Sequence, residues 1–122
     1  MAKYLDIHLE DAVSLDELDQ IVENKMPCAI SLVPEFLRQG RYSHKCLELV
    51  KEGIKQGVVL GQQGDTHKCG NNHHLVDRWH EMACPYGRKL EYERQKEIMQ
   101  RGRETLEDAF NASPRLFVPP NH

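Results

Sequence analysis

The sequence has no apolar segment long enough to cross a membrane. Its 122 residues are 39% apolar, and no run approaches the ~18 apolar residues that a transmembrane helix needs. The first residues, MAKYLDIHLED, contain no apolar signal-peptide core. We therefore expect a cytoplasmic protein, or a chain whose leader has been removed, and no membrane partner.

An excess of basic charge is also absent. The net charge is -3 and the pI about 6.1, so the chain lacks the electrostatic footprint of a nucleic-acid-binding protein. The chain contains no GxSxG motif, no GxGxxG motif and no phosphate-binding loop. Nothing therefore points to a serine hydrolase or a nucleotide-binding enzyme.

Cysteine is sparse, with four in the chain. In a reducing compartment we expect no disulfides, and Cys28 and Cys46 lie in apolar patterns typical of packed thiols. Cys69 and Cys84 flank several histidines, which leaves a structural zinc site open as an alternative. Their spacing does not match the common CxxC or HxxxH pairs. The histidines of this region are His67, His73, His74 and His80.

Apolar and amphipathic segments alternate along the chain. Short apolar runs predict strands at 3–9, 27–33, 58–60 and 115–118. Residues 35–42 predict a polar loop or short turn, and residues 62–89 a long polar loop. Amphipathic spacing predicts helices at 14–24, 43–57 and 90–110, with Ser14 and Ser43 as N-caps. Strands that alternate with helices indicate an α/β domain with a parallel sheet and right-handed connections.

Polar side chains follow three of these strands, in HLED (8–11), GQQGDTH (61–67) and VPPNH (118–122). In parallel sheets, functional residues collect at the carboxyl ends of the strands. A catalytic zinc ion takes three protein ligands and activates water. From adjacent strand ends, Asp11 and His67 are candidate ligands and Glu10 a candidate base, and Gly64 allows a positive-φ turn that directs His67 inward.

The same residues also have structural interpretations. Glu10 and Asp11 precede a helix, whose dipole favours acidic residues. His67 also fits a plain loop histidine, and His73, His74 and His80 fit solvated loop positions. Asn121 and His122 lie at a terminus, where chains fray.

Four stretches together resemble the polysaccharide deacetylase family of the glycoside hydrolase/deacetylase superfamily, in particular its short, divergent members. YLDIHLEDA resembles a first motif in which a strand ends in two acids. LGQQGDTHKC resembles a second motif of the His-Gly-x-x-His type. WHEMACPYG resembles the loop that follows, and ASPRLFVPPNH resembles a third motif with a proline-rich turn.

The resemblance implies part of a distorted (β/α) barrel and a divalent metal, zinc above all. It places Glu10 at the position of the base, Asp11 at the metal-binding acid and His67 at the second metal histidine. Pro119 falls at the third-motif proline. The implied reaction is metal-dependent hydrolytic removal of acetyl groups from a carbohydrate, and the implied substrate-binding residues are Gln63, Pro119, Asn121 and His122.

This sequence departs from the family pattern in several places. Glu10 stands for the usual Asp, Gln63 stands where the first metal histidine is expected, and Arg115 lies too early for the third-motif arginine. The chain ends just after the third motif, so we expect residues 1–122 to form a single, incomplete barrel domain. Such a domain is either a fragment or a half that pairs with a second copy or another partner.

Three functions follow from these observations. The first is a metal-dependent carbohydrate deacetylase, in which His8, His73 or His74 replaces the missing ligand; His8 fits less well because strand alternation directs it away from Leu9. The second is a sugar- or metal-binding relative without turnover. The third is a small interaction protein organised by zinc at residues 67–84.

Overall fold

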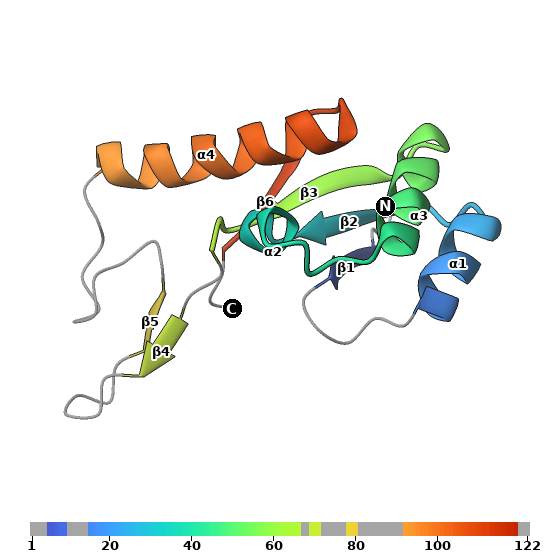
Figure 1. Ribbon diagram of the computed structural model, residues 1–122, viewed down its shortest axis with the longest axis horizontal. Coiled ribbons are helices and arrows are strands. Elements are labelled where there is room, and N and C mark those ends of the chain that lie inside the picture. Colours follow the sequence, from blue (N-terminus) through green and yellow to red (C-terminus); the bar gives the residue numbers. More distant parts are fainter. Residues whose placement is uncertain (1–4, 10–14, 67–68, 72–77, 81–91, 120–122) are drawn as a thin grey trace.

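The fold is described from a computed structural model. It describes residues 5–9, 15–66, 69–71, 78–80 and 92–119. Four parallel strands form its sheet in the order β1-β2-β3-β6 (Figure 1). Their bounds are β1 Leu5–Leu9, β2 Cys28–Leu32, β3 Val59–Gln63 and β6 Leu116–Val118. The predicted parallel α/β arrangement is confirmed.

Four helices accompany the sheet: α1 Leu15–Glu23, α2 Pro34–Arg38, α3 His44–Lys55 and α4 Tyr92–Phe110. The Ser43 side chain caps α3 by accepting a hydrogen bond from the Cys46 amide, as the sequence predicts. Helix α4 ends where Asn111 adopts φ +52°, a left-handed conformation that asparagine tolerates. Figure 1 shows α4 extending along β3 and β6, with α1 and α3 together at the opposite end of the sheet.

Regular structure lies in two segments where the sequence predicted none: a loop or short turn was predicted at 35–42 and a loop at 62–89, and both predictions were wrong. Helix α2 lies within the predicted loop at 35–42, where Pro34 occupies the start of the helix and needs no amide donor. The predicted loop at 62–89 contains an antiparallel pair, β4 Cys69–Asn71 and β5 Arg78–His80. His80 therefore belongs to a strand, and its pairing partner is Cys69.

Strand β3 also extends beyond its predicted end. It includes Gln62 and Gln63, which the sequence places in a loop. Both are buried, at 3% and 0% exposure. Buried amides are tolerated where hydrogen bonds replace water, and Gln62 has two such bonds to backbone carbonyls.

The two faces of the sheet differ in character. Ile7, Leu9, Ile30 and Leu60 belong to one apolar cluster that includes side chains of all four helices. Because side chains alternate along a strand, the residues between them face the other way. That second face, which we call the polar face, carries Asp6, His8, Ser31 and Gln63.

Candidate functional site

The carboxyl ends of the strands meet at one edge of the sheet, as predicted. The register places Leu9 beside Leu32, and Leu32 beside Gln62. Strand β2 therefore separates the ends of β1 and β3, which are two strand spacings, or about 10 Å, apart. The expectation that Asp11 and His67 leave adjacent strand ends was wrong.

The predicted site residues divide into two groups. Gln63 and Pro119 lie in the described part of the chain. Gln63 is fully buried on the polar face at the end of β3, and Pro119 is exposed just after β6. The others lie outside the described residues: Glu10, Asp11, His67, Asn121 and His122.

A tyrosine hydroxyl fixes the end of β1 directly before Glu10. Tyr42 donates a hydrogen bond to the carbonyl of Leu9 at 2.6 Å and accepts one from the amide of Val33 at 2.9 Å. A single side chain thus joins the ends of β1 and β2. The sequence offered no signal for this role, because Tyr42 lies in a segment read as loop.

The segment that leads toward His67 is held by neighbouring elements. Gly64 adopts φ +55°, as expected of this glycine, and its amide donates to the carbonyl of Val118 at 3.0 Å. The Gln62 side-chain amide donates to the carbonyls of Gly64 and Met99, both at 3.0 Å. These bonds tie the end of β3 to β6 and to α4.

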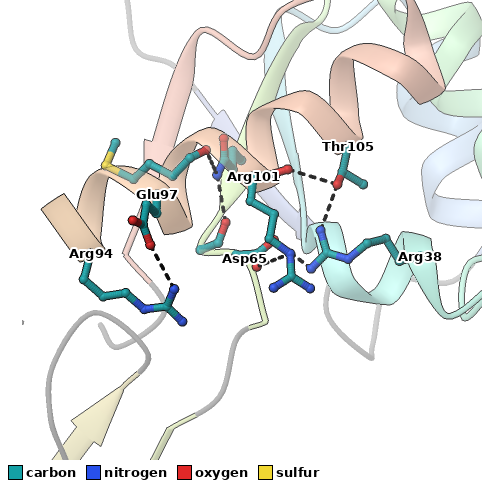
Figure 2. Close-up of polar contacts among 9 residues, drawn as sticks. Arg38, Asp65, Arg94, Glu97, Arg101 and Thr105 are labelled. Atoms are coloured by element: carbon teal, nitrogen blue, oxygen red, sulfur yellow. Dashed lines mark hydrogen bonds and ion pairs between the residues drawn. The ribbon is translucent and has the colours of Figure 1, made fainter.

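Asp65 forms a buried ionic junction in the same segment. Its carboxylate is 2% exposed and lies 2.7 Å from a guanidinium nitrogen of Arg38 in α2 and 3.6 Å from that of Arg101 in α4 (Figure 2). Arg38 also donates to the Thr105 hydroxyl at 2.8 Å. The Asp65 carbonyl accepts from the Glu35 amide at 2.8 Å, at the start of α2. Sequence analysis assigned Asp65 no role.

A second polar cluster lies on the polar face of β1 and β2. The His8 ring nitrogen Nε2 lies 2.9 Å from Asp6 Oδ2, and the Ser31 hydroxyl donates to Asp6 Oδ1 at 2.8 Å. Sequence analysis considered His8 alone. Its partner could have been found, since Asp6 and His8 alternate along a strand and must share a face.

The buried cysteines of β2 and α3 are unsuited to nucleophilic chemistry. Cys28 and Cys46 are buried free thiols, as predicted. Burial raises the pKa of both thiols, and the negative charge of Asp6 raises the pKa of Cys28 further. A thiol with a raised pKa stays protonated at neutral pH and reacts slowly.

The residues in the described part of the chain do not fit a catalytic zinc ion. They contain no group of three histidine, cysteine, aspartate or glutamate side chains that could hold a metal. At the position where the resemblance expects a histidine, Gln63 offers a neutral carboxamide. Zinc prefers imidazole, thiolate and carboxylate ligands. Of the three metal ligands that the resemblance expects, the one at position 63 is therefore replaced by a poor ligand.

A groove of about 670 Å³ lies between α4 and β6, away from this edge's buried junction. Its lining includes Tyr92, Met99, Arg103 and Phe117. Of the predicted site residues that the structure describes, neither Gln63 nor Pro119 lines it, although Gln62, the neighbour of Gln63, does. This groove is therefore not the predicted site.

Comparisons with known proteins address the fold. No family model matches the sequence, and no curated protein matches it. A solved structure does match: a mutant of a CE4 family pseudoenzyme, with restored enzymatic activity. The TM-score is 0.59 and the identity 19%, over 96% of this chain and 35% of that chain. The chain thus has the fold of part of a deacetylase-type barrel and spans about a third of that structure's length.

Proposed function

We propose that this chain is a carbohydrate-binding unit with a deacetylase-type fold that binds its ligand without hydrolysing it. The observation that carries the proposal is the buried Gln63. It is 0% exposed at the end of β3, at the position where the resemblance expects a metal-binding histidine. The other groups of the proposed site are Glu10, Asp11 and His67, with Pro119, Asn121 and His122 as further carbohydrate contacts.

A carboxamide at this position weakens metal-dependent chemistry. It carries no charge and competes poorly with imidazole for zinc. Activation of water requires a metal that is firmly held with an open coordination position. With two proposed ligands, Asp11 and His67, zinc affinity falls, and with it the hydrolysis of an acetyl group.

Metal-dependent deacetylation is the second candidate. The solved structure supports it in one respect, because that pseudoenzyme mutant has restored enzymatic activity. Loss of activity on this fold can therefore be reversed by substitution. In this chain, Gln63→His would supply the imidazole that the resemblance expects, and Glu10 would be the base.

The test compares wild type with Gln63→His. The matched control is Gln100→His, at an exposed position of α4. Zinc content and acetate release from N-acetylated chito-oligosaccharides are measured, together with thermal stabilisation by the same sugars. We expect sugar-induced stabilisation without acetate in wild type, and tighter zinc binding in Gln63→His alone. Acetate release by the wild type that depends on zinc and is lost in Asp11→Ala would establish the hydrolase instead.

The proposal includes a cytoplasmic location and a carbohydrate partner. It also includes a second copy or a further polypeptide that pairs beside β6, since Leu116 of this edge strand is 39% exposed. The mass of the protein in solution tests this part. None of the described helices is long and apolar enough to span a membrane.

A further inference from the structure

Strand β6 leaves one edge of the sheet open to a further strand. It pairs with β3 on one side, and none of the described strands lies on its other side. Its sequence, Leu-Phe-Val, carries no charge. Pro114 and Pro119 stand on either side of it, so the stretch that can pair is short and its register is limited. An uncharged apolar edge of this kind readily accepts another strand.

The backbone of Phe117, the central residue of β6, faces the open edge. The next carbonyl, that of Val118, accepts a hydrogen bond from the Gly64 amide on the β3 side. Because the backbone groups of successive strand residues point to opposite sides, the amide and carbonyl of Phe117 point away from β3. Two copies of β6 in antiparallel orientation can therefore pair around Phe117, with each Phe117 donating to and accepting from the other.

The middle of α4 lies level with Phe117. The register partner of Phe117 is Gln62, whose side chain donates to the carbonyl of Met99 at 3.0 Å and comes close to Gly102. Helix α4 extends along β3 and β6 (Figure 1). A twofold axis that passes beside Phe117, perpendicular to the sheet, therefore passes level with residues 99–102. It would bring α4 and its copy antiparallel to one another on the same face of the joined sheet.

The charges on the groove wall of α4 are complementary to their own copy about the same axis. Lys96 and Glu104 both line the groove and are exposed. The ion pairs within α4 involve other side chains, and Glu104 accepts a hydrogen bond from the neutral amide of Gln100. Lys96 and Glu104 stand at equal distances before and after Gln100, which is level with the axis. In an antiparallel helix pair, each Lys96 would therefore face the Glu104 of the other copy.

We propose that two copies of this chain associate through β6 and the groove wall of α4, about a twofold axis beside Phe117. A twofold interface must be complementary to itself, and here the strand edge and the helix charges meet this condition about one axis. The two α4 helices would lie two to three strand spacings, or roughly 10–14 Å, apart, a gap that the long side chains of the groove can fill. Association would also cover Met99, which is 39% exposed. The inference rests on the edge pairing included in the proposed function and names the second copy as the partner.

The test is sedimentation of the full chain over a dilution series. We expect the mass of two chains at high concentration and of one chain on dilution. Lys96→Glu and Glu104→Lys should each weaken association by about tenfold or more, because like charges then face one another twice across the axis. The double variant Lys96→Glu/Glu104→Lys should recover the wild-type affinity. The matched control is Asp108→Lys, an equal charge reversal at an exposed position of α4 that does not line the groove.

Circular dichroism establishes that each variant is folded. A wild type with the mass of one chain at every concentration would overturn the proposal. So would a dimer that neither single reversal weakens, or a double variant that associates no better than the single ones. Thermal stabilisation by N-acetylated chito-oligosaccharides, measured on the same proteins, separates this inference from sugar binding. Stabilisation of a chain that stays single would overturn the dimer alone, and a dimer that no sugar stabilises would overturn sugar binding alone.

Discussion

The carboxylate of Asp65 lies 2.7 Å from the guanidinium of Arg38 and joins the end of β3 to α2. This junction is the most buried ionic contact in the described part of the chain, since Asp65 is 2% and Arg38 26% exposed. Arg101 approaches from α4 with 62% exposure. Three elements therefore depend on one acidic side chain.

Asp65→Asn should destabilise the fold by about 1–3 kcal/mol. Breaking a buried pair costs about 3–5 kcal/mol because a charge is left uncompensated, and the partial exposure of both arginines reduces this cost. Urea unfolding measures the change. The control is Glu97→Gln, which removes the exposed Arg94–Glu97 pair of 3.2 Å and should cost less than about 0.5 kcal/mol. Equal stability of the two variants would contradict the prediction.

Gly102→Ala should destabilise the protein although alanine favours helices. An added Cβ would lie 2.4 Å from the Gln62 side-chain nitrogen and 3.0 Å from Pro34 Cγ. Overpacking costs about 1–3 kcal/mol, which exceeds the gain in helix propensity of about 1 kcal/mol. Thermal melts measure the difference.

Gly53→Ala on α3 is the matched substitution. Its added Cβ would lie 3.3 Å from Val58 Cγ2 and 3.5 Å from Val22 Cγ2, so a shift of a few tenths of an ångström is enough to accommodate it. Here propensity should prevail, and we expect a change between zero and about 1 kcal/mol of stabilisation. If Gly102→Ala proves as stable as Gly53→Ala, then the close approach of Gln62 does not limit α4 packing.

Tyr42→Phe tests the connection between the ends of β1 and β2. The change removes the hydroxyl that bonds Leu9 and Val33 and retains the ring. Each lost hydrogen bond costs about 0.5–1.5 kcal/mol, so we expect a loss of about 1–3 kcal/mol in total. Hydrogen exchange at the Val33 amide should accelerate more than exchange at Ile30. Uniform acceleration would indicate that Tyr42 stabilises the sheet only globally.

Stability should fall as the pH rises through the cysteine range. Burial raises the pKa of Cys28 and Cys46 above the ordinary value of 9.0, so the folded protein holds these protons more tightly than the unfolded chain does. The resulting stabilisation is fully present below pH 9 and is lost above it as the folded thiols ionise. Urea midpoints of wild type and the Cys28→Ala/Cys46→Ala variant, compared at pH 7 and pH 10, measure this; an equal decline in both proteins would exclude the thiols as the cause.

Sequence patterns predicted the strands and long helices because burial imposes regular spacing on them. Helix α2 has only five residues, too few for a periodic signal, and its first turn is stabilised from outside by the Asp65 carbonyl. The end of β3 was misread for a related reason. Glutamine is typical of loops, and Gln62 is buried in a strand because its side chain donates to the carbonyl of Met99. That partner is 37 positions away, so no local pattern reveals it.

The candidate site was predictable in part. Alternation along β1 correctly separates His8 from Leu9, and the glycine conformation of Gly64 was anticipated. The order of the strand ends was misjudged, since the position of β2 between β1 and β3 follows from pairing and not from motif spacing. The Arg38–Asp65 contact could not be foreseen, because it joins two segments that were both read as loop.

The register of β6 has a consequence for how the chain is made. Leu116 pairs with Gly61, so 55 residues of synthesis separate the two partners, whereas β1, β2 and β3 follow one another closely. A ribosome releases the first three strands while their final neighbour has not yet been translated. The nascent chain should therefore assemble a three-stranded intermediate first and add β6 in a late step, because long-range parallel pairing is slow.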